Sequence, residues 1–185
     1  MLCGLAEAVN FACPRVSQGY NAAVDLQQFF LKQKAAIRNR SREVFALLRP
    51  EHMGWKPAAG ALSVGEMLCH LWVSEEGVRR VALEGNFAYY EARIPGGLPA
   101  VIGTPGTLEE ELRKVERVHA ETLAAVRACP PEKFDEERIH EGLGFRRKVS
   151  VILLGINEHE VHHRAQLMTY LRMLGTPAPE PFGRR

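Results

Sequence analysis

The sequence lacks the cysteine spacing of a zinc ribbon or a redox pair, since no two cysteines share a Cys-x-x-Cys motif. Its four cysteines are scattered singly, at Cys3, Cys13, Cys69 and Cys129. It also lacks the basic flank and apolar stretch of a secretory signal, and no run approaches the roughly 18 apolar residues of a membrane span. We therefore expect a reduced, soluble, cytoplasmic protein with no membrane partner.

The chain has little excess of charge of either sign. It carries 24 Lys plus Arg against 22 Asp plus Glu, a formal net charge of +2, which does not indicate a nucleic-acid partner or an anionic membrane surface. Apolar residues make up 46% of the sequence and charged residues 25%, a composition typical of globular proteins. A length of 185 residues allows one domain with a substantial core.

Runs of alternating polar and apolar residues are missing too, whereas four segments have the apolar spacing of amphipathic helices. These segments span about residues 24–48, 63–83, 107–129 and 151–174. Capping-box sequences begin the second and third segments, at Ser63 and Thr107, and Ser150 is a suitable N-cap for the last. The sequence therefore predicts an all-α four-helix bundle.

The segments between these helices are long. Residues 85–106 are dense in glycine and proline, which predicts a long loop, and residues 134–149 suggest a loose hairpin. We expect residues 1–19 to form an N-terminal extension outside the core. Residues 20–185 then make up the bundle, with its long connections and a short proline-rich C-terminal tail.

The stretch HEVHH in the last helix carries the strongest chemical signal. His159 and His163 are one helical turn apart on an apolar stripe, so their imidazoles face the core and can converge on one metal ion. His70 in the second helix is a third inward histidine. Aliphatic neighbours cannot satisfy the nitrogens of a buried imidazole, so burying all three rings requires either hydrogen-bond partners or a shared metal. One divalent metal ion would satisfy all three at once. Zinc is our first expectation, with nickel or iron as alternatives.

HEVHH also matches the H-E-x-x-H motif of zinc peptidases, but the rest of a peptidase site is missing. In the metzincin extension, Gln166 stands at the glycine position and Thr169 at the last histidine position. Only Glu180 follows as an acidic residue, in the proline-rich tail, and no upstream sheet is predicted that could bind an extended peptide. We therefore reject the peptidase interpretation and look upstream for the third ligand.

Two segments, GWKPAAGALSVGEMLCHLW and HEVHHRAQLMTYLRMLG, resemble the DinB-like superfamily of bacterial four-helix proteins, which includes thiol-dependent S-transferases and mycothiol-dependent isomerases. The resemblance covers about residues 20–175. It implies a metal site of three histidines, one on the second helix and two on the last, here His70, His159 and His163. Ala165 replaces the glycine that is usual in the family, a change that affects only local packing.

The sequence leaves three hypotheses for function. In the first, favoured by the resemblance, the metal binds a low-molecular-weight thiol as thiolate, and the protein transfers its sulfur to a small-molecule substrate. In the second, metal-bound water hydrolyses the substrate, with Glu160 or Glu158 as base. In the third, the protein is not catalytic and the metal stabilises a homodimer or another complex. Apolar residues outside the ligand stripe favour a homodimer: Trp72, Val161, Met168 and Met173.

Other polar residues of the last helix receive simpler interpretations. Gln166 and Tyr170 lie on or near the ligand stripe, where each could bind a ligand's second ring nitrogen or the substrate. Arg164 points away from the stripe, which predicts a solvated side chain. The remaining histidines are expected away from the site: His162 lies off the ligand stripe, and the others are expected on the surface or in loops, at His52, His119 and His140.

Overall fold

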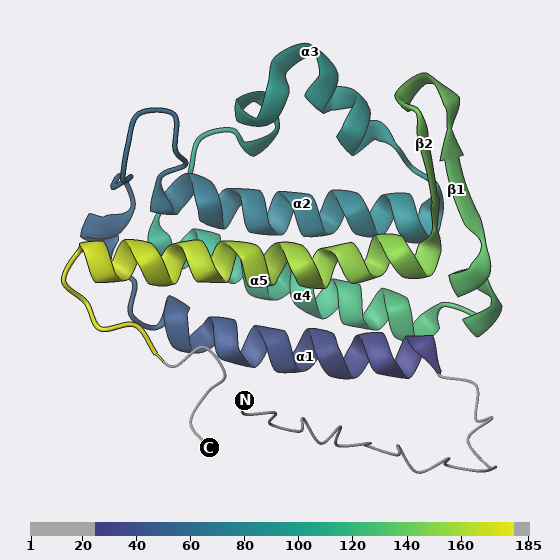
Figure 1. Cartoon of the computed structure of the whole chain (residues 1–185), viewed down its shortest axis with the longest axis horizontal. Coiled ribbons are helices and arrows are strands. Elements are labelled where there is room, and N and C mark those ends of the chain that lie inside the picture. Colours follow the sequence, from purple (N-terminus) through teal and green to yellow (C-terminus); the bar gives the residue numbers. More distant parts are fainter. Residues whose placement is uncertain (1–24, 180–185) are drawn as a thin grey trace, which may run out of the picture.

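Four long helices form the body of the protein, as the sequence predicts. The structure is a computed structural model that describes residues 25–179 (Figure 1). Its long helices are α1 (Leu26–Phe45), α2 (Val64–Glu84), α4 (Leu108–Ala128) and α5 (Val149–Met173). α2 packs against α4 and α5, and α1 packs against the same two helices. The extension predicted over residues 1–19 lies outside the described residues.

Side-chain caps set the predicted starts of two helices. Ser63 Oγ accepts a hydrogen bond from the backbone N–H of Glu66, and the Glu66 carboxylate accepts one from the backbone N–H of Ser63. Thr107 and Glu110 repeat this capping box at the start of α4. Gly85, with φ of 68°, ends α2 in the left-handed conformation that glycine adopts without a Cβ penalty.

The start of α5 differs from the prediction. Ser150 is not its N-cap, because the helix begins at Val149 and the N-cap residue, Lys148, makes no side-chain capping bond. The backbone N–H of Val149 donates instead to the carbonyl of Glu136, at the foot of the preceding hairpin. The hairpin therefore satisfies the first backbone donor of the helix, and Ser150 lies inside the helix.

Residues 85–106 contain helix α3 (Ala88–Ile102), so the prediction of a long loop is wrong. Two helical pieces meet at Gly97, whose φ of 62° breaks the helix between the two prolines. α3 lies over α2 (Figure 1) and docks closely at Gly77, where a Cβ atom would stand 2.2 Å from the Tyr89 ring. A glycine at position 77 thus permits the contact that brings α3 to the bundle.

The predicted hairpin is present at one end of the bundle. β1 (Glu137–His140) pairs antiparallel with β2 (Phe145–Lys148), and β2 leads directly into α5. Short 3-10 turns complete the connections, at Pro50–His52, Pro131–Asp135 and Glu141–Leu143. No helix within residues 25–179 is long and apolar enough to cross a membrane.

The core consists of two apolar clusters separated by a polar layer. One cluster surrounds Phe30 and Leu153, and the other surrounds Leu68 and Leu171, towards the opposite ends of the helices. Between them each long helix contributes polar side chains that are less than 9% exposed. They include Lys34, Arg38, Ser74, Glu75, His119, Thr122, Asn157, Glu160 and His163. The polar layer is where chemistry can take place.

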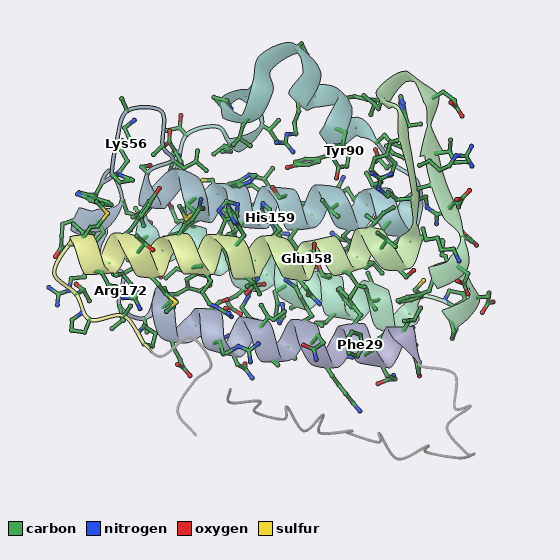
Figure 2. All side chains as sticks on the ribbon, viewed as in Figure 1. Phe29, Lys56, Tyr90, Glu158, His159 and Arg172 are labelled. Atoms are coloured by element: carbon green, nitrogen blue, oxygen red, sulfur yellow. The ribbon has the colours of Figure 1, made fainter. Side chains whose placement is uncertain are left out.

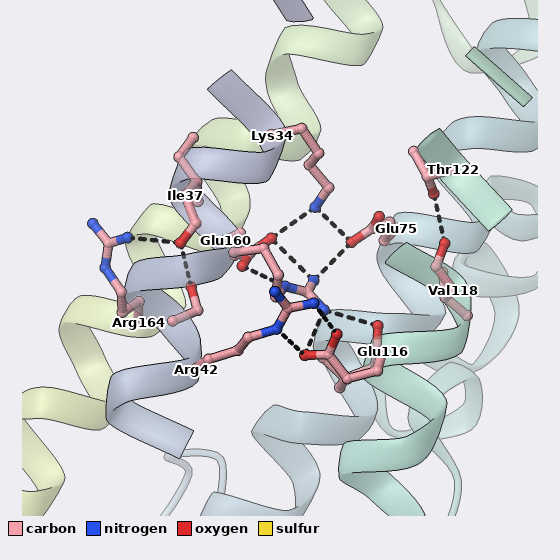
Figure 3. Close-up of polar contacts among 12 residues, drawn as sticks. Lys34, Ile37, Arg42, Glu75, Glu116, Val118, Thr122, Glu160 and Arg164 are labelled. Carbon is pink, nitrogen blue, oxygen red and sulfur yellow. Dashed lines mark hydrogen bonds and ion pairs between the residues drawn. The ribbon is translucent and has the colours of Figure 1, made fainter. Parts of the chain in front are cut away.

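Two cations and two carboxylates form a buried ion-pair network in this layer (Figure 3). Lys34 Nζ donates to Glu75 Oε2 and Glu160 Oε2, each at 2.7 Å. Arg38 binds both oxygens of Glu160, at 2.8 and 3.0 Å, and contacts Glu75 Oε2 at 3.2 Å. Burial acts to raise the pKa of Glu160, but Lys34 and Arg38 lower it by more. The pKa of Glu160 therefore lies below its usual value, and the carboxyl group stays ionised. The four charges balance one another.

His119 lies beside this network on α4 and is buried, so the prediction of a surface histidine is wrong. Burial, together with the nearby charges of Arg38 and Lys34, lowers the pKa of His119 to about 3. In the unfolded chain a histidine titrates near pH 6.5. The unfolded state therefore binds the extra proton first as the pH falls, and the contribution of His119 to stability is lost below about pH 6.5.

We expect this loss to reach about 1–2 kcal/mol between pH 7 and pH 5. His119→Leu should reduce the pH dependence of the free energy of unfolding by that amount, because leucine cannot bind a proton. Urea denaturation of the wild type and the variant at both pH values, in the presence of a chelator, measures this difference. Equal pH dependence in the two proteins would contradict the burial of a neutral imidazole.

Candidate metal centre

Three imidazoles from α2 and α5 meet in the polar layer. His159 Nε2 lies 2.9 Å from His70 Nε2 and 3.0 Å from His163 Nε2, and one nitrogen of each ring lies within 4.8 Å of the other two. His70 and His163 are buried, and His159 is partly exposed. The structure thus brings together the three histidines that the sequence predicts as ligands, although His70 is 89 residues away from His159.

Hydrogen bonds to the Nδ1 atoms orient two of these rings. His163 Nδ1 contacts Gln166 Oε1 at 2.6 Å, which is the role predicted for Gln166. His70 Nδ1 contacts Ser74 Oγ at 3.0 Å, and Ser74 Oγ contacts the Tyr89 hydroxyl of α3 at 2.8 Å. Such contacts fix the orientation of metal-binding imidazoles in other proteins.

Tyr170 does not take part in the centre, contrary to prediction. Its hydroxyl donates to the carbonyl of Leu62 at 3.1 Å, and its ring packs edge-on against Trp55 at a centroid distance of 5.2 Å. The side chain therefore fixes the loop before α2 and has no contact with the histidines.

The surroundings keep the three imidazoles neutral. Burial, together with charge repulsion from His163 and Arg93, lowers the pKa of His70 to about 4. Burial and the two neighbouring rings lower the pKa of His159 to about 3. Burial also lowers the pKa of His163. Neutral imidazole is the form that binds a metal ion, so the protein offers lone pairs at neutral pH without first losing protons.

The contacts among the three rings fit a metal ion better than they fit hydrogen bonds. An amide oxygen only accepts, so His163 Nδ1 donates to Gln166 and its Nε2 carries a lone pair. His159 Nε2 contacts the Nε2 atoms of both other rings. If it carries a proton, that proton can make a good hydrogen bond to only one of them. If His70 Nε2 carries the proton instead, the contact between His159 and His163 joins two lone pairs. A cation accepts all three lone pairs, and the observed separations approach the roughly 3.3 Å expected around tetrahedral zinc.

Glu160 of the motif and Glu158, which precedes it, lie away from this arrangement. Glu160 is 2% exposed, and both its carboxylate oxygens accept hydrogen bonds from Arg38 or Lys34. Glu158 is exposed on α5 (Figure 2). Arg164 is buried and donates to the carbonyl of Ile37 at 3.3 Å, so the prediction of a solvated arginine is wrong.

Only two of the four apolar residues proposed for a homodimer are exposed. Met168 is buried in the core, and Trp72 is partly buried and donates to Glu111 Oε2 at 2.8 Å. Val161 and Met173 are exposed, on the same helix. A homodimer therefore stays a prediction, with a smaller apolar surface than the sequence suggested.

The remaining histidines take no part in the centre. His52 lies in the connection between α1 and α2, as predicted, but it is buried there, and its Nδ1 accepts from the backbone N–H of Arg49 at 3.2 Å. His140 lies on β1, where Nε2 contacts Glu91 at 3.1 Å. His162 is exposed, as expected.

A cavity of about 350 Å³ opens directly beside the histidines. His70, Ser74 and Glu75 of α2 line it on one side and His159 on another, and Tyr90 reaches down from α3 on the outer side (Figure 2). Further lining residues are Val78, Tyr89, Arg93, Phe145, Arg147, Val151, Ile152, Gly155 and Ile156. A cavity of this size admits a small molecule next to the proposed metal position.

The sequence alone did not identify several of the residues that line the cavity. Arg93 and the two tyrosines lie in the segment that glycine and proline made look like a loop. Glu75 could have been found, since Lys34 and Arg38 share the buried face of α1 with Phe30 and Ile37. Charged residues at buried positions of a helix indicate carboxylate partners elsewhere in the core.

The bond from Ser74 to His70 leads to a prediction for metal affinity. Ser74→Ala removes the partner of His70 Nδ1 and should weaken zinc binding by about 10–100-fold, a loss typical when such supporting groups are removed. Competition with a chromophoric chelator measures the affinity. Ser41→Ala is the matched control, because the Ser41 hydroxyl is buried on α1 and donates only to its own helix. Unchanged affinity in Ser74→Ala would exclude this support.

Comparison with known proteins identifies similar chains. A family model described as DinB superfamily matches residues 34–167. The uncharacterized protein YjoA of Bacillus subtilis is 27% identical over 141 residues, which cover 75% of this chain and 84% of YjoA. The crystal structure of YjoA superposes with a TM-score of 0.65 at 23% identity, covering 85% of this chain and 99% of that one.

A second solved structure is also similar in fold. YfiT from Bacillus subtilis, described as a "probable metal-dependent hydrolase with an unusual four-helix bundle topology", superposes with a TM-score of 0.63 at 12% identity. The match covers 86% of this chain and 94% of YfiT. At this identity the likeness concerns the fold.

Proposed function

The chain belongs to the DinB superfamily, and from this premise we propose that it is a metal-dependent enzyme that acts on a small molecule. His70, His159 and His163 hold one divalent ion, most favourably zinc, with nickel or iron as alternatives. The observation that carries the proposal is the approach of three neutral Nε2 atoms to one point beside a cavity. A bound divalent ion supplies a Lewis acid there that stabilises negative charge on a sulfur or oxygen atom.

Transfer of a thiol is the reaction that the site supports best. In this reaction a thiolate sulfur attacks an electrophilic carbon of the substrate, and the leaving group departs with its bonding electron pair. The thiol proton goes to solvent. Such a step needs no carboxylate base, which suits a site whose motif glutamate, Glu160, has both oxygens engaged.

No cysteine within residues 25–179 is placed to supply the thiol, so we expect the thiol to be a separate molecule. Cys69 and Cys129 are buried and do not line the cavity. Burial and the Glu111 carboxylate raise the pKa of Cys69 to about 12, which keeps it protonated. A low-molecular-weight thiol is the natural co-substrate, and we place the protein in the cytoplasm, where such thiols remain reduced.

Hydrolysis is the second candidate. YfiT is described as a probable metal-dependent hydrolase, and one carboxylate in this chain could serve such a reaction. Glu75 contributes to the cavity wall, and its Oε1 has no hydrogen-bond partner within residues 25–179. Figure 3 shows contacts to only one of its two oxygens. Glu75, and not Glu160, is therefore the base to test for this reaction.

One experiment separates the candidates. Zinc-loaded protein is mixed with an aryl chloride electrophile in the presence of cysteine or glutathione, and in parallel with an aryl ester without thiol. Thiol-dependent turnover that disappears in His70→Ala supports S-transfer, and ester cleavage without thiol that disappears in the same variant supports hydrolysis. Turnover of neither substrate class, or turnover that survives His70→Ala, contradicts a metal-dependent enzyme.

A further inference from the structure

Two arginines line the cavity without a carboxylate partner among residues 25–179. Arg93 of α3 lies over the Tyr89 ring, with its guanidinium carbon 5.5 Å from the ring centroid. Arg147 of β2 donates to the carbonyl of Arg146 at 2.8 Å. Neither side chain forms an ion pair in that part of the chain, although guanidinium groups are always charged.

The other two arginines of the hairpin, Arg138 and Arg146, each form an ion pair with a glutamate. Arg146 Nη1 binds Glu137 at 2.8 Å, and Arg138 Nη1 binds Glu136 at 2.9 Å. Successive residues of a strand point to opposite faces, so Arg146 and Arg147 cannot face the same side. Of these three arginines, only Arg147 lines the cavity.

The cavity wall holds no negative charge to balance these two arginines. Glu75 is the only carboxylate among its lining residues, and its charge is already balanced by Lys34 and Arg38, which donate to its Oε2 atom. The two histidines of the wall, His70 and His159, are neutral because burial lowers their pKa values. The cavity is therefore positively charged before any metal binds.

The walls between the charged groups are largely apolar. Val78 of α2, Phe145 of β2 and Ile152 and Ile156 of α5 line the space, together with Tyr90. On α5 the lining residues run from Val151 to His159, which at 1.5 Å per residue is a length of about 12 Å. The histidines lie at one end of this length, and Arg147, on the strand that leads into α5, lies towards the other.

We propose that the cavity binds a small organic carboxylate with an apolar body. Its body lies along α5, its carboxylate is bound by Arg147 with support from Arg93, and its uncharged end points towards the histidines. This last orientation rests on the proposed function, whereas recognition of the carboxylate does not. Arginine suits the role because its planar donors match the two oxygens of a carboxylate.

The test uses 3-phenylpropionate as the probe and its neutral amide, 3-phenylpropionamide, as the matched control ligand. Titrations are followed by the amide NMR signal of Gly155, which lines the cavity. They are run on metal-free protein with a chelator present, so that a bond between carboxylate and zinc cannot contribute. We expect the carboxylate to bind about 10-fold or more tightly than the amide, because charged hydrogen bonds contribute more than neutral ones.

Variants identify the residues involved. Arg147→Gln and Arg93→Gln should each weaken binding of 3-phenylpropionate about 3- to 10-fold, a modest loss because both side chains contact solvent. Arg146→Gln, on the same strand but outside the cavity, should bind like the wild type. All three lie on the surface, and unchanged melting temperatures show that they fold.

The outcomes separate this inference from the metal proposal. Preference for the carboxylate that falls in Arg147→Gln and persists in Arg146→Gln supports the inference, even in a protein that never binds zinc. Equal binding of amide and carboxylate, no binding of either, or equal losses in Arg146→Gln and Arg147→Gln would overturn it. The metal proposal fails separately, if the same protein does not bind zinc after the chelator is removed and zinc is added.

Discussion

Replacing His163 with alanine is expected to abolish tight, stoichiometric metal binding while leaving the helices folded. Four-ligand zinc sites bind with about 10–16 kcal/mol, so one imidazole contributes on the order of 3–4 kcal/mol, or about 10²–10³-fold in affinity. The wild type should purify with close to one metal ion per chain and the variant with much less. Zinc should also raise the melting temperature of the wild type far more, because a ligand stabilises the state that binds it.

His162→Ala is the control for this result. His162 is adjacent in sequence and carries the same imidazole group, but its side chain is exposed and outside the three-histidine cluster. It should retain the metal content and the zinc-dependent stabilisation of the wild type. Equal loss of metal in the two variants, or equal retention, would show that adventitious binding at a histidine-rich surface accounts for the metal.

Replacing Glu160 with alanine is expected to destabilise the protein by about 3–5 kcal/mol, because it leaves Lys34 and Arg38 buried with one carboxylate between them. That is a large fraction of the 5–15 kcal/mol that holds a typical domain folded. Chemical denaturation of the metal-free proteins measures it. Under conditions where the variant is still folded, its zinc affinity should remain close to that of the wild type.

Glu158→Ala is the matched control. It removes a carboxylate from the same turn of α5, but from an exposed position, and should change stability by less than about 0.5 kcal/mol. A Glu160→Ala protein as stable as Glu158→Ala, but with its turnover lost, would restore Glu160 as the catalytic base of the motif.

Local signals in the sequence were sufficient for much of the fold. The capping boxes at Ser63 and Thr107 mark the starts of α2 and α4, because each depends on side chains only three residues apart. The convergence of His159 and His163 follows from helical spacing. His70 was within reach because it lies on the buried side of α2, and the resemblance to a family supplied the pairing across 89 residues.

Features that depend on contacts between distant segments could not be predicted from local signals in the sequence. Composition at residues 85–106 predicted a loop, yet docking of Tyr89 at Gly77 holds that segment as a kinked helix. Arg164 and His119 seemed solvated because helical projection does not show what covers a polar face. In the bundle Arg164 reaches a carbonyl of α1, and the ion-pair network lies beside His119.

The H-E-x-x-H motif therefore has divided roles in this chain. Its histidines meet His70 in one cluster, of which His70 and His159 line the cavity, and its glutamate faces α1 and holds two cations in the core. In a zinc peptidase the same spacing directs the glutamate to the metal-bound water. The difference comes from Lys34 and Arg38, which bind both carboxylate oxygens of Glu160.

X-ray absorption spectroscopy of the zinc-loaded protein tests the central claim most directly. We expect a shell of nitrogen or oxygen atoms at about 2.0–2.1 Å, with the multiple-scattering pattern of three imidazoles in the wild type. His163→Ala, loaded at a zinc concentration that fills its weakened site, should show two. A sulfur shell near 2.3 Å in protein free of added thiol, or the same imidazole number in both proteins, would show that the metal is held elsewhere.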